Sequence, residues 1–259
     1  MDLGIAGRHA IVFGGSRGMG RACAQQLASE GVNVVIAART ESVLAEAAQA
    51  MTAATGTQVR HVAADITTDA GREAVLAACP APDILVNNAD GVLPGDFRNW
   101  TQADWHGALD AMALGPIDMI RRVVDGMMER RFGRIVNIVS RSVKTPQLEL
   151  GLSNGARSCL VGFVAGLARQ TVRHNVTINN LLPGVFATDA QRRHIEGMLE
   201  PGGKSFDELW EERGTNNPAG RYGQAHEIGA LCAFICAAQA GYICGQSILI
   251  DGGAYPGTY

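Results

Sequence analysis

The chain has 259 residues, of which 47% are hydrophobic and 18% are charged, and its formal net charge is -3. This composition supplies enough apolar material for a folded core and excludes an intrinsically disordered protein. Because basic residues are not in excess, we expect neither a nucleic acid nor an anionic membrane as a partner.

The N-terminus and the cysteines indicate where the protein works. The first residues, MDLGIAGRHAIVFGG, contain no basic leader and no cleavage site, so we expect no signal peptide. No apolar run is long enough to span a membrane. The cysteines form no CxxC pair, and the histidines lack metal-ligand spacing. We therefore predict a cytoplasmic protein without a metal site.

Short apolar runs alternate with helical patterns along the whole chain. The predicted strands are His9–Phe13, Asn33–Ala38, Gln58–Ala63, Ile84–Asn87, Arg134–Val139, Thr177–Leu182 and Ser247–Ile250. The predicted helices are Gly18–Glu30, Glu41–Thr55, Asp69–Cys79, Gln102–Arg131, Ser153–Arg173 and Ala225–Ala238. This alternation predicts one α/β domain over residues 1–259. We expect a Rossmann-like, doubly wound parallel sheet of about seven strands with helices on both faces.

A glycine-rich turn joins the first predicted strand to the first predicted helix. Its glycines allow positive φ angles and close approach of the backbone to a pyrophosphate. The helix that begins there offers free N–H groups and the positive end of its dipole. The position of the turn in a βαβ unit predicts a dinucleotide site, and a plain tight turn is the alternative. The predicted contacts are Gly14, Ser16, Arg17, Gly18, Met19 and Gly20.

Arg39 and Thr40 directly follow the second predicted strand, and they indicate which dinucleotide binds. NAD-binding proteins usually place an acidic residue here to bind the adenosine ribose. A guanidinium can instead bind a 2′-phosphate with two hydrogen bonds, and Arg17 could reach the same phosphate. The sequence therefore predicts NADP(H) rather than NAD(H), with an exposed strand-end arginine as the alternative interpretation.

Residues 188–217 interrupt the alternation of strands and helices with a segment rich in charge and glycine. A long insertion at the ligand edge of a domain is typical of a lid, and a mobile surface excursion is the alternative. The segment carries the apolar residues Phe206, Leu209 and Trp210. We therefore predict a lid over the substrate.

Together these motifs resemble the short-chain dehydrogenase/reductase family, in particular its 3-oxoacyl-carrier-protein-reductase-like branch. The resemblance covers nearly the whole chain, although Phe13 replaces a usual threonine and Asp90 replaces the glycine of an NNAG motif. It implies that Asp65 caps the adenine amino group and that the segment from Pro183 to Thr188 holds the nicotinamide carboxamide. The further cofactor contacts that the resemblance implies are Asp65, Ile66, Asn87, Ala89, Pro183, Gly184 and Thr188.

The predicted active site departs from the Ser, Tyr, Lys and Asn set of this family. Ser140 matches the serine, but the tyrosine and lysine positions hold Ser153 and Arg157, and the asparagine position holds Met112. The first tyrosine in the chain is Tyr222, so no shift in register restores the missing phenol. A serine hydroxyl is a much weaker acid than a phenol, and arginine stays protonated.

We assign a role to each of these residues. Ser140 is expected to bind the reacting oxygen, Ser153 to orient substrate or a water, and Arg157 to hold the nicotinamide ribose. Lys144 is the candidate proton source, with a solvated loop lysine as the alternative interpretation. Tyr255 or Tyr259 could contribute, for example from a neighbouring subunit, and Ser142 is a weaker candidate.

We therefore predict an NADP(H)-dependent oxidoreductase that acts on a small carbonyl or alcohol substrate with a non-standard proton donor. The alternatives are a cofactor-binding lyase or isomerase and a non-catalytic sensor or partner subunit. The family resemblance also implies a homodimer or homotetramer. The fifth predicted helix offers apolar residues beside small ones for such an interface. These are Leu160, Gly162, Phe163, Val164, Ala165, Gly166, Leu167 and Ala168.

Overall fold

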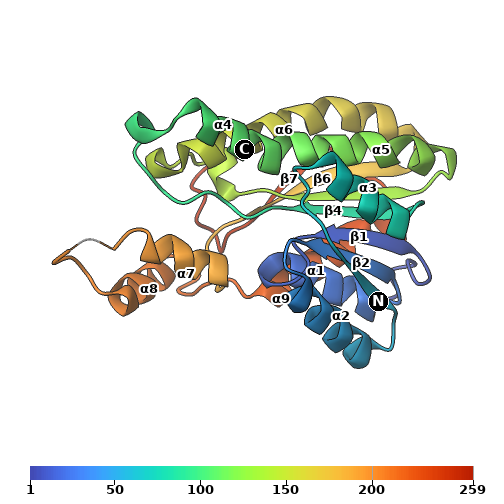
Figure 1. Cartoon of the computed structure of the whole chain (residues 1–259), viewed down its shortest axis with the longest axis horizontal. Coiled ribbons are helices and arrows are strands. Elements are labelled where there is room, and N and C mark those ends of the chain that lie inside the picture. The colour runs from blue at the N-terminus through green and yellow to red at the C-terminus, as the bar shows by residue number, and fades with distance from the viewer. Residues whose placement is uncertain (200, 259) are drawn as a thin grey trace.

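The computed structural model describes residues 1–199 and 201–258 and is built on one parallel sheet (Figure 1). The sheet has 7 strands in the order β3-β2-β1-β4-β5-β6-β7. The strands are β1 His9–Phe13, β2 Asn33–Ala38, β3 Val59–Ala63, β4 Ile84–Asn88, β5 Gly133–Ile138, β6 Val176–Pro183 and β7 Ser247–Ile250. The predicted doubly wound α/β fold is confirmed, and no predicted strand end is displaced by more than a single residue.

Helices cover both faces of the sheet, and alternating strand residues supply one core to each face. On one face, α1 Gly18–Ser29, α2 Glu41–Thr55 and α9 Ala225–Cys236 pack against residues such as Val12. On the other, α3 Asp69–Ala78, α5 Gly115–Glu129 and α6 Gly151–Thr171 pack against residues such as Ile11. The strand order reverses between β1 and β4, where doubly wound sheets bind ligands beyond the carboxyl ends of their strands.

The prediction of a single helix over Gln102–Arg131 is wrong. Helix α4 covers Gln102–Leu109, a π-helical turn, η2, covers Asp110–Leu114, and α5 follows. Pro116 stands in the first turn of α5 and has no N–H to donate to the carbonyl of Met112, so the α-helical hydrogen-bond pattern is broken there. The turn packs Met112 against α6 in a small buried cluster with Ala108, Leu152 and Ala156.

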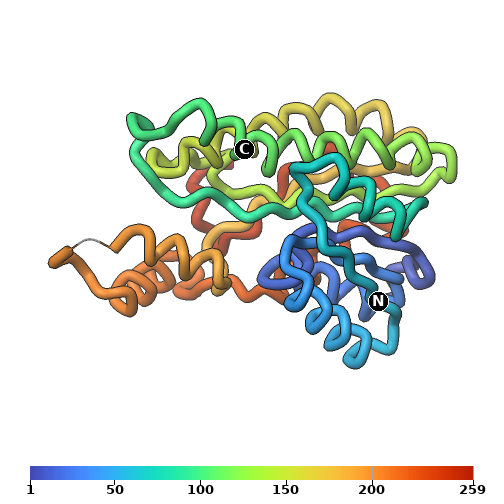
Figure 2. Tube along the Cα trace, viewed as in Figure 1, coloured from blue at the N-terminus to red at the C-terminus, as the bar shows by residue number. Residues whose placement is uncertain are grey.

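Two helices project from the body of the molecule at one end (left in Figures 1 and 2). They are α7 Asp189–Glu196 and α8 Phe206–Thr215, and they lie within the segment predicted as a lid. Trp210 stacks on Tyr222 with ring centroids 4.3 Å apart, and the Tyr222 hydroxyl donates to the Trp210 carbonyl over 2.9 Å. Trp210 therefore anchors α8 to the body.

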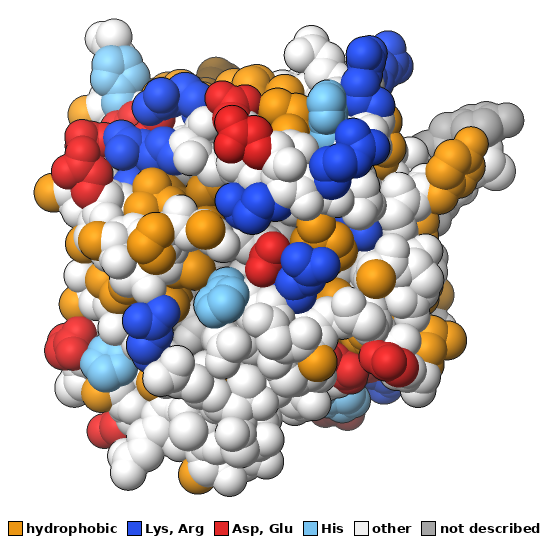
Figure 3. Space-filling model, turned by 90° about the vertical axis from the view of Figure 1, so that its right-hand side faces the viewer, with side chains coloured by type: hydrophobic (Ala, Val, Ile, Leu, Met, Phe, Trp, Pro, Cys, Tyr) orange, Lys and Arg blue, Asp and Glu red, His pale blue; other side chains and the backbone are white. Residues whose placement is uncertain are grey.

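The far end of the molecule has a different character. Figure 3 views the end opposite α7 and α8, where acidic and basic side chains are interspersed with apolar ones. Because charges of both signs are mixed on that face, it has no continuous positive surface that would attract a polyanion. Among the described residues, no helix combines the length and the apolarity that a bilayer crossing needs.

Candidate active site

The glycine turn has the geometry that a bound diphosphate needs. Gly14 and Gly18 have φ angles of 63° and 55°, which other residues rarely adopt. A Cβ at Gly20 would collide with the carbonyl oxygen of Gly14, so the turn and α1 pack closely only with glycine there. The residue before α1, Arg17, gives no side-chain cap, which leaves the first N–H groups of the helix available to an anion.

Three charged residues, Arg39, Asp65 and Asp90, lie beside this turn, just after the ends of β2, β3 and β4. Arg39 Nη2 lies 3.7 Å from a carboxylate oxygen of Asp90, and the positive charge of Arg39 helps lower the pKa of Asp65. The second oxygen of Asp90 lies 3.7 Å from Arg193 on α7. Asp90 therefore links the predicted 2′-phosphate residue to the lid, and sequence reasoning missed this link.

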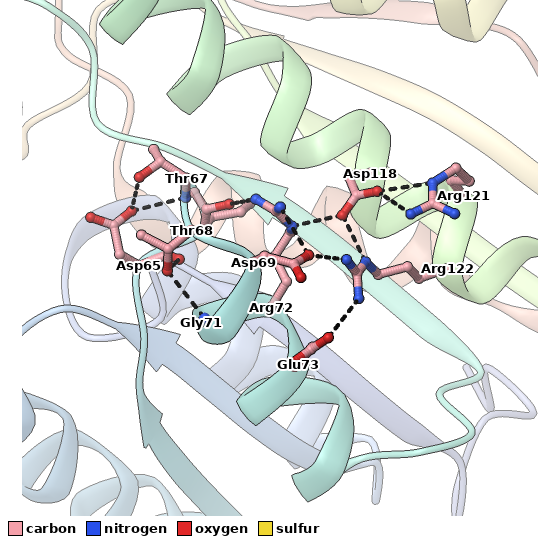
Figure 4. Close-up of polar contacts among 11 residues, drawn as sticks. Asp65, Thr67, Thr68, Asp69, Gly71, Arg72, Glu73, Asp118, Arg121 and Arg122 are labelled. Carbon is pink, nitrogen blue, oxygen red and sulfur yellow. Dashed lines mark hydrogen bonds and ion pairs between the residues drawn. The ribbon is translucent and has the colours of Figure 1, made fainter.

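Asp65 is held by its own loop (Figure 4). One carboxylate oxygen accepts hydrogen bonds from the Thr67 backbone N–H over 2.9 Å and from the Thr67 hydroxyl over 2.8 Å. The backbone bond is the largest cause that lowers the pKa of Asp65, followed by the hydroxyl and Arg39, and burial opposes them. The side chain is therefore an ionised acceptor, as a contact to an adenine amino group requires. The neighbouring Ile66 is buried, and its carbonyl accepts from Arg72 over 2.7 Å.

The remaining predicted cofactor residues lie along the same edge. Thr188 caps α7 by accepting from the Gln191 N–H, and its methyl group lies 3.7 Å from where a Cβ at Gly18 would stand. Gly184, after Pro183 at the end of β6, donates its N–H to Ile250 over 3.0 Å. Thr40 precedes α2 without a side-chain cap bond. The fold thus brings the start of the lid next to the glycine turn.

A row of amides crosses the sheet from β4 to β7. Asn87 donates to Asn137 over 2.9 Å, Asn137 donates to Asn180 over 3.0 Å, and Asn180 donates to Ser247 over 3.3 Å. Each residue is the register partner of the next. The side-chain NH₂ of the predicted cofactor residue Asn87 therefore helps to hold β4 against β5. Its side-chain oxygen, Oδ1, is buried without a partner among the described residues.

Arg157 occupies the position of the family's lysine, and its guanidinium forms hydrogen bonds with other groups of the protein. It donates from Nε to Ser153 Oγ over 3.1 Å, from Nη1 to the Ile138 carbonyl over 3.1 Å and from Nη2 to the Ala89 carbonyl over 3.3 Å. Burial lowers the pKa of Arg157 to about 10, and the charge of Asp90 opposes this shift. The guanidinium therefore ties α6 to the ends of β4 and β5 and remains a cation at neutral pH.

Ser153, at the tyrosine position, lies beside Met112, at the asparagine position. Its hydroxyl accepts from Arg157 and lies 3.9 Å from the Met112 sulfur, to which it donates. Both side chains are buried. At the positions of the missing tyrosine and asparagine, a weak hydrogen bond therefore joins two buried side chains, and Ser153 has little access to substrate.

Ser140 and Lys144 lie in the loop that follows β5. The Ser140 hydroxyl accepts from the Ser142 N–H over 3.1 Å, and both Ser140 and Lys144 are half-buried. The Lys144 ammonium lies 5.7 Å from the centre of the Tyr255 ring. Tyr259, the other tyrosine considered above, lies outside the described residues.

A cavity of about 330 Å³ opens between this loop and the lid. Arg141 and Gln147 line it from the loop, Val185 lines it just after Gly184, and Leu209 and Arg213 line it from α8. The described lining also includes Ile195, Met198, Glu212, Asn216, Asn217 and Ala254. The predicted lid thus borders a cavity next to Ser140, but the two arginines were not singled out from the sequence.

Comparisons with known proteins agree with this geometry. A family model described as enoyl-(acyl carrier protein) reductase matches residues 14–255. The chain is 31% identical over 259 residues to the NADPH-dependent reductase BacG of Bacillus subtilis, covering 95% of this chain and 97% of that protein. It is 30% identical over 263 residues to the 3-oxoacyl-[acyl-carrier-protein] reductase FabG of Escherichia coli, covering 98% and 99%.

A solved structure shares nearly the whole architecture. It is L-sorbose reductase from Gluconobacter frateurii, complexed with NADPH and L-sorbose, and it matches with a TM-score of 0.93 at 27% identity. The match covers 99% of this chain and 100% of that one. The agreement extends over both the glycine turn and the lid.

Proposed function

The chain belongs to the short-chain dehydrogenase/reductase family, and on that premise we propose that it is an NADP(H)-dependent oxidoreductase acting on a small carbonyl or alcohol substrate. The observation that carries this proposal is the position of Arg39. It lies beside Asp65 and the glycine turn, at the switch in strand order, where a 2′-phosphate needs a cation. The relatives named above are reductases, so the lyase, isomerase and sensor alternatives are not favoured.

The residues of the site fit the cofactor. We assign the pyrophosphate to the turn from Gly14 to Gly20, the 2′-phosphate to Arg39 and Arg17, and the adenine to Asp65. We assign the nicotinamide to the segment from Pro183 to Thr188, in which Val185 lines the cavity. When bound, NADPH supplies a hydride to a carbonyl carbon.

The chain itself orients the substrate and handles the proton. We assign the reacting oxygen to Ser140, and the proton that this oxygen takes up to Lys144, which lies in the same loop as the cavity residues Arg141 and Gln147. Arg157 holds the ends of β4 and β5 in place and has N–H groups left for a ribose hydroxyl. The electrostatics of this fixed cation favour the developing negative charge on the oxygen.

Loss of nicotinamide absorbance tests the proposal. Purified protein with NADPH should oxidise it only when a ketone or aldehyde from a panel of small carbonyl compounds is added. Lys144→Gln should slow this turnover, whereas Arg173→Gln, which removes an exposed positive charge just before β6 and away from the cavity, should not. Tight binding of NADPH with no oxidation by any carbonyl compound would contradict the redox function.

Three further features are part of the proposal. We propose that the segment 188–217, with α7 and α8, closes over the substrate, because it borders the cavity. We propose a homodimer or homotetramer through α6, which exposes Phe163 between glycines. The location in the cytoplasm stays a prediction from the sequence.

A further inference from the structure

The cavity under the lid carries an unbalanced positive charge. Its charged lining consists of Arg141, Arg213 and Glu212, and the carboxylate of Glu212 is paired with Lys204 over 2.5 Å. Within the described part of the chain, neither arginine forms an ion pair with a carboxylate. The two guanidinium groups therefore face one cavity with no carboxylate at ion-pair distance, and the one acidic residue of the described lining, Glu212, is itself paired with Lys204.

Arg213 is the more deeply placed of the two. Its Nε is buried and has no hydrogen-bond partner among the described residues, and its Nη1 donates only to the Met198 sulfur over 3.7 Å. A thioether sulfur is a weak acceptor, so the N–H groups of this side chain are poorly satisfied. A buried donor without a partner is costly, and a ligand acceptor would relieve that cost.

The electrostatic surroundings of Arg213 agree with this geometry. Burial is the largest cause that lowers its pKa, the nearby Arg141 lowers it further, and Tyr222 and Glu149 act in the opposite direction. Each guanidinium therefore sits in the unfavourable field of the other, and an anion placed between them would remove that repulsion.

We propose that this cavity binds the carboxylate of the substrate between Arg141 and Arg213, so that the enzyme acts on small oxo acids. The proposal rests on the proposed function, because Val185 and Arg141, the residue that follows Ser140, line the same cavity. Arginine binds planar carboxylates through paired hydrogen bonds, which neither a ketone nor an ester can form. The cavity volume of about 330 Å³ limits the substrate to a compact molecule.

Hydride transfer to such a substrate is balanced. The nicotinamide C4–H bond breaks and a C–H bond forms at the oxo carbon, whose C=O becomes C–O–H after uptake of one proton. The carboxylate takes no part in this step, and its ion pairs only position the oxo group.

Binding and turnover of matched ligands test the proposal. Calorimetry on the protein loaded with NADP⁺, which has no hydride to transfer, would use 2-oxohexanoate, its methyl ester and hexan-2-one, with a phosphate monoester of similar length as a further arm. The acid should bind at least about 10-fold more tightly than the ester. Tighter binding of the phosphate monoester than of the acid would overturn the assignment to carboxylates.

Arginine variants locate the effect. Arg213→Gln and Arg141→Gln should each remove most of the preference for the acid over the ester. Arg192→Gln should retain it, because Arg192 is a lid arginine that lies over the Trp210 ring and does not line the cavity. Far-ultraviolet circular dichroism would show that each variant is folded, and either cavity variant serves if the other unfolds.

The outcomes separate this inference from the proposed function. Oxidation of NADPH by the ketone and the acid with equal efficiency would overturn the carboxylate site and leave the reductase intact. Selective binding of the acid without any oxidation of NADPH would support the carboxylate site and contradict the reductase. Full acid preference in both Arg213→Gln and Arg141→Gln would also overturn the site.

Discussion

At the scale of single residues, the proposed site makes Arg39 the residue that selects the dinucleotide. Its guanidinium lies beyond β2 among the carboxylates of Asp65 and Asp90. Arg39→Asp should reduce the affinity for NADPH by at least about 10-fold, because a third carboxylate there would repel a 2′-phosphate. The affinity for NADH should be kept or should rise, because an acidic residue at this position can bind the adenosine ribose. Fluorescence titration with each nucleotide measures both affinities.

A matched control uses another exposed arginine. Arg173 precedes β6 and therefore lies at the amino ends of the parallel strands, opposite the carboxyl ends that hold the cofactor site. Arg173→Asp changes the net charge equally and should leave both affinities unchanged. An unaltered ratio of NADPH to NADH affinity in Arg39→Asp would remove Arg39 from the 2′-phosphate site.

Arg157 performs a structural task at the lysine position. Arg157→Lys should lower the free energy of unfolding by about 1–3 kcal/mol, because one ammonium cannot reach Ser153 and the carbonyls of Ile138 and Ala89 together. Urea unfolding measures this change. Arg169→Lys, at an exposed arginine of the same helix, should change it by less than about 0.5 kcal/mol. Equal stability of the two variants would show that the three bonds are dispensable.

At the scale of elements, an ion-pair network joins α3 to α5 (Figure 4). Asp118 on α5 accepts from Arg121 and Arg122 of its own helix and pairs with Arg72 of α3 over 2.7 Å. Arg122 also pairs with Asp69 of α3. Burial raises the pKa of Asp118, but the bonds and charges of Arg122 and Arg121 outweigh it and bring the value from 3.8 down to about 2.

This network predicts part of the acid sensitivity of the protein. A carboxyl group whose folded pKa is lowered stabilises the fold above its unfolded value, and that stability is lost as the pH falls from 3.8 through about 2. Asp118→Asn should cost about 1 kcal/mol at neutral pH and flatten the fall in stability over that range. Unfolding monitored by circular dichroism at several pH values tests this.

Asp125 provides the comparison for this test. It is an exposed acid on the same helix, so Asp125→Asn removes the same charge from α5 outside the network. The variant should keep the acid-dependent fall of the wild type. An identical pH profile for Asp118→Asn and the wild type would mean that the network adds no stability.

The elements were more predictable from the sequence than the contacts between them. Strands and most helices follow from apolar periodicity and glycine, which are local signals. The π-helical turn escaped prediction because Pro116 breaks the hydrogen-bond pattern without breaking the apolar pattern. The partners of Arg157 lie on β4 and β5, and Arg141 and Arg213 meet across a cavity, so neither arrangement leaves a local signal.

At the scale of the whole molecule, the exposed face of α6 predicts self-association. Phe163 is 37% exposed, and, apart from neighbouring residues and the nearby backbone of α6 itself, no described atom lies within 4 Å of where a Cβ would stand at Gly162 or Gly166. Small residues let a second copy approach closely. The wild type should sediment as a dimer or tetramer, and Phe163→Asp should shift it toward the monomer. Phe234→Asp, on α9, serves as the control.

The sedimentation result has a clear contrary outcome. A monomeric wild type at micromolar concentration would contradict an interface on α6. So would a Phe163→Asp variant that associates as strongly as the wild type while Phe234→Asp dissociates. In the second case the interface would lie on the face that carries α9.

Asp90 pairs with Arg39 and with Arg193. Its carboxylate therefore occupies the place beside Arg39 that we propose for the 2′-phosphate of the nucleotide. An arriving 2′-phosphate exchanges one negative group for another, so sodium chloride should weaken NADPH capture only slightly. Asp90→Asn should make capture stronger in dilute buffer and more sensitive to salt, and titrations at several ionic strengths would show this.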